Sequence, residues 1–187
     1  MADEPGSALD LPDPCLVVLI GAAGSGKSTL AARLFAPDQI LSSDAYRAVV
    51  SGDEANQAAT QVAFKILHRE LERRLAAGRT SVVDATNVTS HARRSLLRRA
   101  AAHGVPAVAI VLDLPPELVQ SRNALRSGRT VPAAAVSRQL AALVGALHRD
   151  ELATEGYAAI HRLRAAAEAD SLRLRRGGPA HDRAGPP

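Results

Sequence analysis

Residues 21–28, GAAGSGKS, match a phosphate-binding loop of the form G-x-x-x-x-G-K-[ST] at every fixed position. Gly21, Gly24 and Gly26 permit turns in which backbone N–H groups point inward. Together with the N-terminus of the helix expected to follow, these amides would form a cradle for a phosphate. The loop follows the apolar run at 15–20, and helical sequence follows the loop. This motif predicts a nucleoside triphosphate site.

The polar residues of this loop predict how the triphosphate is held. Lys27 is expected to bridge the β- and γ-phosphates of ATP, and Ser28 to offer its hydroxyl to Mg²⁺. Asp84, which closes the apolar run SVVD, would hold Mg²⁺ through water or hold the Ser28 region in shape. The residues predicted to bind the nucleotide are Gly21, Ala22, Ala23, Gly24, Ser25, Gly26, Lys27, Ser28 and Thr29.

A second polar group lies in ILSSDAYR, residues 40–47. Asp44 and Arg47 are three residues apart, so they would share one face of a helix. A kinase needs a carboxylate to orient or deprotonate the acceptor hydroxyl, and cations for the moving phosphoryl group. In the structural alternative, one of Ser42, Ser43 and Asp44 caps the helix and Arg47 is exposed. From the residues alone, both interpretations stay open.

Other classes of phosphate-loop protein lack their signatures here. A switch GTPase would carry an N-K-x-D element, and the sequence has none. A mechanical ATPase would close a strand with two acidic residues, but Ala85 follows Asp84. Among the classes that use this loop, kinase is favoured.

Apolar runs alternate with helical sequence of ten residues or more, which is typical of parallel βαβ units. We predict an α/β phosphate-loop NTPase fold, a three-layer sandwich around a mostly parallel sheet of about five strands, with a helical lid. The expected strands are 15–20, 39–41, 80–87, 106–114 and 157–163. The expected helices run from the loop to Pro37 and over 44–50, 54–77, 90–103, 115–126 and 132–151. In the fourth of these, RRSLLRR (93–99) is expected to be a solvated basic face.

Composition fits one domain of 187 residues, 47% of them hydrophobic. We expect a disordered lead at 1–14, a kinase domain at 15–170 with its lid at about 115–135, and a flexible tail at 171–187. With Cys15 as the single cysteine there is no internal disulfide, and no secretory signal or membrane span is recognisable. These features predict a soluble cytoplasmic protein. The net charge of +4 permits nucleic-acid binding without indicating it, because an arginine-rich composition also follows from a GC-rich genome.

The elements GAAGSGKSTLA, ILSSDAYR, GRTSVVDATNV and RNALRSGR occur in an order that resembles the kinase module of bacterial polynucleotide kinase-phosphatases. The resemblance runs from about Cys15 to Leu163. It implies an ATP-dependent kinase acting on the 5′-hydroxyl end of RNA or DNA, with Asp44 as general base. Arg47 would contact the phosphate of the acceptor nucleotide.

The same resemblance implies that Arg122 and Arg126 are lid arginines that close over the ATP phosphates, with Arg129 as a further candidate. Their spacing would place Arg122 and Arg126 on one helical face. Thr86 and Asn87 would position the acceptor or brace their loop.

The sequence also departs from that family, whose best-known members carry a phosphatase and a ligase. No D-x-D phosphatase nucleophile occurs in it, so we expect either a free-standing kinase, with a separate phosphatase or ligase as a possible partner, or a relative whose acceptor has changed. A homo-oligomer, common in relatives, stays open. Tyr46 is the only aromatic residue expected near the acceptor, which weakens the argument for stacking on a base. Two alternatives remain: a kinase for a small-molecule hydroxyl (nucleoside, sugar or antibiotic) and a non-catalytic ATP-binding module.

Overall fold

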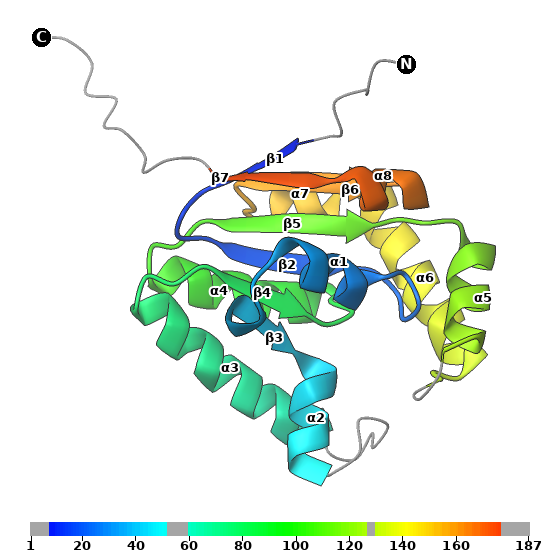
Figure 1. Ribbon diagram of the computed structural model, residues 1–187, viewed down its shortest axis with the longest axis horizontal. Coiled ribbons are helices and arrows are strands. Elements are labelled where there is room, and N and C mark those ends of the chain that lie inside the picture. Colours follow the sequence, from blue (N-terminus) through cyan, green and yellow to red (C-terminus); the bar gives the residue numbers. More distant parts are fainter. Residues whose placement is uncertain (1–7, 52–59, 127–129, 177–187) are drawn as a thin grey trace, which may run out of the picture.

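The five strands expected from the sequence form one parallel sheet (Figure 1). The computed structural model describes residues 8–51, 60–126 and 130–176. Across the sheet the strands are β3 (Ile40–Ser42), β4 (Ser81–Asp84), β2 (Leu16–Ile20), β5 (Ala107–Leu112) and β6 (Ala159–Leu163). Every neighbouring pair is parallel. The predicted α/β class is therefore confirmed.

Helices cover both faces of the sheet (Figure 1). The helices are α1 (Lys27–Leu34), α2 (Ser43–Ser51), α3 (Thr60–Ala76), α4 (Ser90–Ala102), α5 (Pro116–Ala124), α6 (Ala133–His148), α7 (Glu151–Thr154) and α8 (Ala166–Ser171), with a short 3₁₀ turn, η1 (Pro37–Gln39). Leu16, Val18 and Ile20 of β2 pack into a core with α3, α4, α6 and α7. Val17 and Leu19, the alternate residues, pack into a second core with α1. This is a three-layer sandwich.

The strand order brings the predicted site residues to one edge of the sheet. From the central strand β2 the chain first builds β3 and β4 on one side and later β5 and β6 on the other. Ligands of open parallel sheets bind at the carboxyl ends of the strands where the order reverses. The phosphate loop follows β2, Ser43 and Asp44 follow β3, and Asp84 ends β4.

Both ends of the described chain contain strands, contrary to expectation. β1 (Ala8–Leu11) pairs in parallel with β7 (Arg173–Arg176). Leu9 and Leu172 are 0% and 2% exposed and belong to the second core. The predicted disordered lead at 1–14 is therefore wrong for β1, and the predicted flexible tail at 171–187 is wrong for Leu172 and β7. Each strand is too short to be recognised alone, and each is stabilised by a partner from the other end of the chain.

Three helices also differ from expectation. Arg93 in α4 is 0% exposed, so the prediction of a solvated face at 93–99 is wrong at this residue. The helix expected at 132–151 is divided into α6 and α7, because Asp150 has a φ of 52°. α3 is described from Thr60, and the earlier part of the helix expected at 54–77 lies outside the described residues. No described helix has the length and apolar character needed to cross a membrane.

Candidate active site

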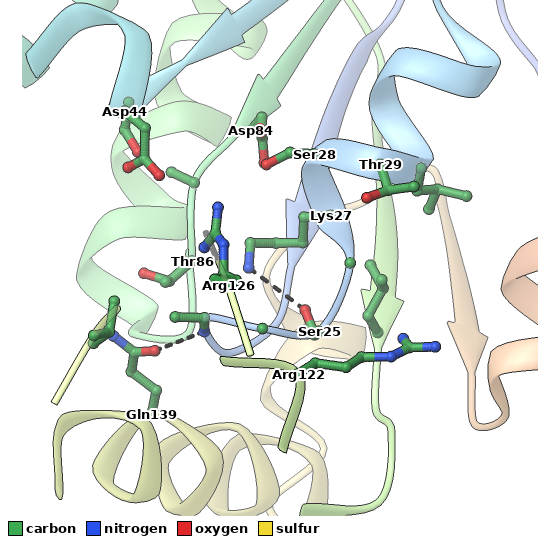
Figure 2. A pocket seen from close by; sticks show the side chains of 18 of the residues that line it. Ser25, Lys27, Ser28, Thr29, Asp44, Asp84, Thr86, Arg122, Arg126 and Gln139 are labelled. Carbon is green, nitrogen blue, oxygen red and sulfur yellow. Dashed lines mark hydrogen bonds between the residues drawn. The ribbon is translucent and has the colours of Figure 1, made fainter. Parts of the chain in front are cut away.

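The phosphate loop forms one wall of a cavity of about 540 Å³ (Figure 2). Ala23 to Thr29 line this cavity, whereas Gly21 and Ala22 do not. Gly26, at φ 95°, precedes α1, and no described side chain caps that helix. The first amides of α1 therefore remain available to an anion, as a phosphate site requires.

Neighbouring segments hold the loop in this shape. The backbone N–H of Ala23 donates to Oε1 of Gln139 on α6 at 2.8 Å (Figure 2). The N–H of Gly21 donates to the carbonyl of Thr86 at 3.0 Å, which ties the loop to the segment after β4. Gln139 could not be predicted from the sequence, because a single glutamine within a helix carries no recognisable signal. The loop is thus positioned by contacts from two distant elements.

Gly24 should tolerate no side chain. A Cβ at this position would lie 2.5 Å from the carbonyl oxygen of Val119 on α5, and its φ is +88°. We expect Gly24→Ala to lower the free energy of unfolding by about 3 kcal/mol or more, and to weaken nucleotide binding. Gly104→Ala is the matched control, because Gly104 has φ +65° with no described heavy atom within 4 Å of the added Cβ. That control should cost about 1 kcal/mol. If urea unfolding showed that Gly24→Ala and Gly104→Ala lower the free energy of unfolding equally, this result would contradict the steric argument.

Lys27 is folded back onto its own loop. Its Nζ donates to the carbonyl of Ala22 at 2.8 Å and to Oγ of Ser25 at 3.5 Å (Figure 2). Burial lowers the pKa of Lys27 to about 8; the charge of Asp84 raises it and that of Arg126 lowers it. Both charged groups therefore lie close enough to act on the same ammonium group.

Nucleotide binding should consequently take up a proton. Phosphate oxygens favour the charged form of Lys27, so its pKa must rise above about 8 in the complex. Uptake should be small at pH 6.5, about half a proton at pH 8, and larger above, with affinity falling as pH rises past 8. Titration calorimetry of a non-hydrolysable ATP analogue, in buffers of different ionisation enthalpy, measures this uptake. Lys27→Met should abolish it, and Lys65→Met, at the exposed second lysine, should leave it unchanged. Uptake that persists in Lys27→Met would assign the proton to another group.

Asp44 and Arg47 lie in the first turns of α2 and both line the cavity. The hydroxyl of Ser42 accepts a hydrogen bond from the N–H of Ala45 at 3.4 Å, so Ser42 occupies the capping position. Arg47 is only 5% exposed and forms an ion pair with Asp44. The structural alternative, with Arg47 as an exposed helical residue, is therefore wrong. The Asp44 side chain, paired with Arg47, faces the cavity (Figure 2).

Residues at the end of β4 and just after it either line the cavity or support the loop that does. Asp84 and Thr86 line the cavity, and Asp84 is 5% exposed. Asn87 turns away: its Nδ2 donates to the carbonyl of Leu19 at 2.8 Å, and its φ of 48° makes the turn. Of the two roles expected for Thr86 and Asn87, Asn87 therefore braces the loop.

Ser28 and Asp84 offer oxygen atoms on the same cavity, and these are the ligands that Mg²⁺ prefers. Among the described residues no group of three or more acidic, histidine or cysteine side chains could enclose a metal ion. A Mg²⁺ ion held by one hydroxyl, one carboxylate through water and the phosphates fits this arrangement, since Mg²⁺ keeps several waters.

Arg122 and Arg126 both reach the cavity, but not from one helical face. α5 ends at Ala124, so Arg126 lies beyond the helix and the predicted shared face is wrong. Nη1 of Arg122 lies 3.8 Å from the position that a Cβ on Gly26 would occupy. The Asn123 side chain makes two hydrogen bonds with the backbone of Val131: Nδ2 donates to the carbonyl, and Oδ1 accepts from the N–H. These bonds join α5 to the segment that leads into α6. Arg129 lies outside the described residues.

Further residues of the cavity were not identified from the sequence. Phe64 on α3 lines the cavity and Tyr46 does not, so the expectation that Tyr46 is the aromatic residue at the acceptor is wrong. Thr60, one turn before Phe64, also lines the cavity. At the opposite end, Arg33, Ala169 and Asp170 contribute to the wall.

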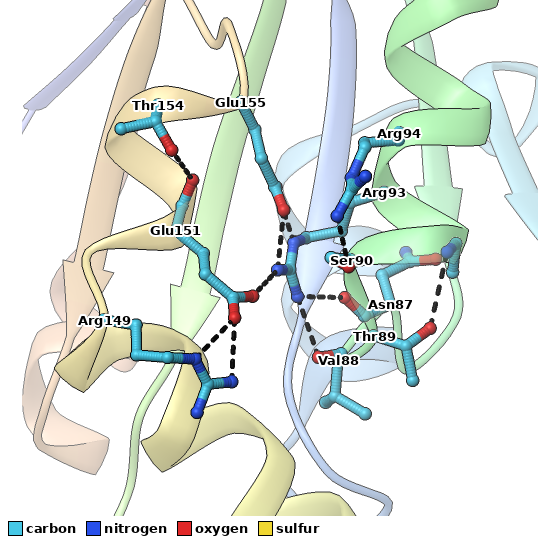
Figure 3. Close-up of polar contacts among 11 residues, drawn as sticks. Asn87, Val88, Thr89, Ser90, Arg93, Arg94, Arg149, Glu151, Thr154 and Glu155 are labelled. Atoms are coloured by element: carbon cyan, nitrogen blue, oxygen red, sulfur yellow. Dashed lines mark hydrogen bonds and ion pairs between the residues drawn. The ribbon is translucent and has the colours of Figure 1, made fainter.

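Arg93 anchors the segment after β4 to α7 (Figure 3). Its guanidinium donates to the carbonyl of Val88 at 2.8 Å and to the carboxylates of Glu155 and Glu151 at 2.7 and 3.0 Å. Both glutamates lie about 60 residues further along the chain, with separations of 62 and 58. A side chain that the sequence placed in solvent is thus the centre of a buried polar network.

A parallel sheet with a phosphate loop after β2, a carboxylate after β3 and arginines across the cavity defines the P-loop kinase class. The chain belongs to the family AAA_33, described as an AAA domain, whose model matches residues 16–146. No curated protein sequence matches the chain.

Solved structures with this fold include kinases of small molecules. An unliganded sugar kinase from Janibacter sp. HTCC2649 has 23% identity and a TM-score of 0.54, covering 81% of this chain and 85% of that one. A gluconokinase from Sinorhizobium meliloti 1021 has 19% identity and a TM-score of 0.50, covering 85% and 91%. The complex AvrRxo1-ORF1:-ORF2 with ATP has 14% identity and a TM-score of 0.67, covering 83% of this chain and 55% of that one. At these identities the similarity establishes the fold.

Proposed function

We propose that the protein is an ATP- and Mg²⁺-dependent kinase that transfers the γ-phosphoryl group to a hydroxyl of a small molecule, with Asp44 as general base. One observation carries the proposal: Lys27 and Ser28 on the donor side and Asp44 on the acceptor side line the same cavity. Its volume of about 540 Å³ is in the range of small-ligand sites. The ATP-bound neighbour supports ATP as the donor.

In this mechanism Asp44 accepts the proton of the acceptor hydroxyl as its oxygen bonds to the γ-phosphorus. The bond from that phosphorus to the oxygen bridging it to the β-phosphate breaks, and ADP leaves. Lys27, Arg122 and Arg126 neutralise charge on the transferred group. Arg47 orients the Asp44 carboxylate through their ion pair. Mg²⁺, held by Ser28 and the phosphates, would supply further positive charge.

A 5′-hydroxyl end of RNA or DNA is the second candidate acceptor. It is favoured by Arg47, which lies beside Asp44 on the cavity and, by the family resemblance, would contact an acceptor phosphate. Against it, many arginines of the described surface are already paired with carboxylates, which lowers the charge available to a polynucleotide. These pairs are Arg73 and Arg74 with Glu70, Arg79 with Asp38, Arg99 with Glu72, Arg149 with Glu151, and Arg162 with Asp113. The sugar kinase and gluconokinase neighbours also favour the small acceptor.

The test is transfer of labelled γ-phosphate from ATP to a panel of sugars, sugar acids, nucleosides and 5′-hydroxyl RNA and DNA oligonucleotides. Labelling of a small acceptor that is lost in Lys27→Met supports the proposal. Labelling of oligonucleotides alone, falling steeply with salt, would select the second candidate. ATP binding without transfer to any acceptor would overturn both and leave a non-catalytic ATP-binding module.

A further inference from the structure

The acceptor end of the cavity is built by two helices. Asp44 and Arg47 come from α2, and Thr60 and Phe64 come from α3. Figure 1 places α2 and α3 together, away from α5 and α8. Thr60 and Phe64 are four residues apart, so they lie on one face of α3. The mechanism assigns no role to either residue.

Thr60 offers a hydrogen-bonding group that the described protein leaves unused. Its Oγ1 is buried and has no hydrogen-bond partner among the described residues. A buried hydroxyl without a partner destabilises the protein, and a ligand that supplies the partner recovers that loss. Thr60 lines the cavity, so this hydroxyl lies beside the space that a molecule bound at the acceptor end would fill.

Phe64 adds a flat apolar surface to the same end. Among the described residues it is the only aromatic side chain that lines the cavity. The ring is half-buried, packs against the core, and lies against His68 with ring centroids 6.0 Å apart. A ring held from behind in this way presents a fixed face, on which the face of a sugar or a base can stack.

We propose that Thr60 and Phe64 select a cyclic acceptor, a sugar ring or a nucleoside, over an open-chain polyol. The ring of the acceptor stacks on Phe64, and a hydroxyl other than the one phosphorylated hydrogen-bonds to Oγ1 of Thr60. This inference rests on the proposed function and specifies its substrate class. An open-chain polyol could satisfy Thr60 but has no flat face for Phe64, and it loses more conformational freedom on binding.

The experiment compares D-glucose with D-sorbitol, its open-chain alditol, and includes adenosine as the nucleoside. The kcat/KM of the wild type for a cyclic acceptor should be at least about tenfold higher than its kcat/KM for sorbitol. This is the factor expected when the contact with Phe64 is lost. With the best cyclic acceptor, Thr60→Val should raise its KM about tenfold, and Thr60→Ser should restore it. Phe64→Leu should raise the same KM by a similar factor. The KM of ATP should stay unchanged in all variants.

A stability measurement separates recognition from a structural role. Thr60→Val removes an unpaired buried hydroxyl at constant shape. It should therefore raise the melting temperature of the free protein and weaken binding of the acceptor. Lys65→Met, exposed on the same helix, should change neither quantity. Equal use of sorbitol and glucose, or an unchanged acceptor KM in Thr60→Val and Phe64→Leu, would overturn this inference while leaving the kinase intact. No transfer by wild type to any acceptor would overturn the proposed function and this inference together.

Discussion

Asp44→Asn is expected to lower kcat by about 10²–10⁴, the usual contribution of a general base, with little change in the KM of ATP. Asparagine keeps the size of the side chain but cannot accept the hydroxyl proton. Steady-state transfer to the best acceptor measures kcat, and equilibrium binding of an ATP analogue shows whether the donor half is intact. Because Arg47 is 5% exposed and pairs with Asp44, the variant should also melt at a lower temperature.

Asp38→Asn is the matched control for this prediction. Asp38 is 69% exposed, pairs with Arg79 on the surface and does not line the cavity. It should leave kcat unchanged. An Asp44→Asn variant that binds ATP and turns over at the wild-type rate would assign the base to another group, and Asp84 would be the next carboxylate to test.

Arg93→Met should cause the largest loss of stability. The substitution leaves the Glu155 carboxylate, on a side chain 6% exposed, without its cationic partner, and removes the hydrogen bond that Arg93 donates to the carbonyl of Val88. Breaking a buried pair on one side costs about 3–5 kcal/mol. For a chain of this length that corresponds to a fall in melting temperature of about 10 °C. Urea and thermal unfolding measure both quantities.

The neighbouring residue provides the control. Arg94 is exposed and bonds only Oγ of Ser90 among the described residues, so Arg94→Met should change stability by less than about 0.5 kcal/mol. Replacing both partners, as in Arg93→Met with Glu155→Leu, should recover part of the loss, because no buried charge then remains. Identical unfolding curves for Arg93→Met and Arg94→Met would show that the buried network contributes nothing.

The sheet and most of the site could be predicted because their signals are local or follow from topology. Each central strand is a continuous apolar run, and helical sequence separates consecutive strands of the sheet along the chain. Once the strands are parallel, the segments after β2, β3 and β4 must meet at one edge. The sequence therefore predicts, without any distance, that Asp44 and Asp84 lie beside the phosphate loop.

What failed depends on partners distant in the chain. Arg93 has the sequence context of a surface residue, and only Glu151 and Glu155, brought beside it by α7, explain its burial. Gln139 acquires a role only when α6 packs against the phosphate loop. Arg126 was expected on a helix, but α5 ends at Ala124 and the arginine reaches the cavity from the following loop.

The pairing of β1 with β7 determines how much of the chain must be present for the nucleotide cavity to be complete. Arg33 on α1 donates to the carbonyl of Leu172 at 2.7 Å, next to α8, whose Ala169 and Asp170 line the cavity. These segments lie outside residues 16–146 matched by the family model, as does β6. A fragment limited to that match would expose β5 as an unprotected edge and uncover the core under β1. During synthesis, the wall at α8 forms last, so a nascent chain would acquire its full affinity for nucleotide only after α8 and β7 have left the ribosome.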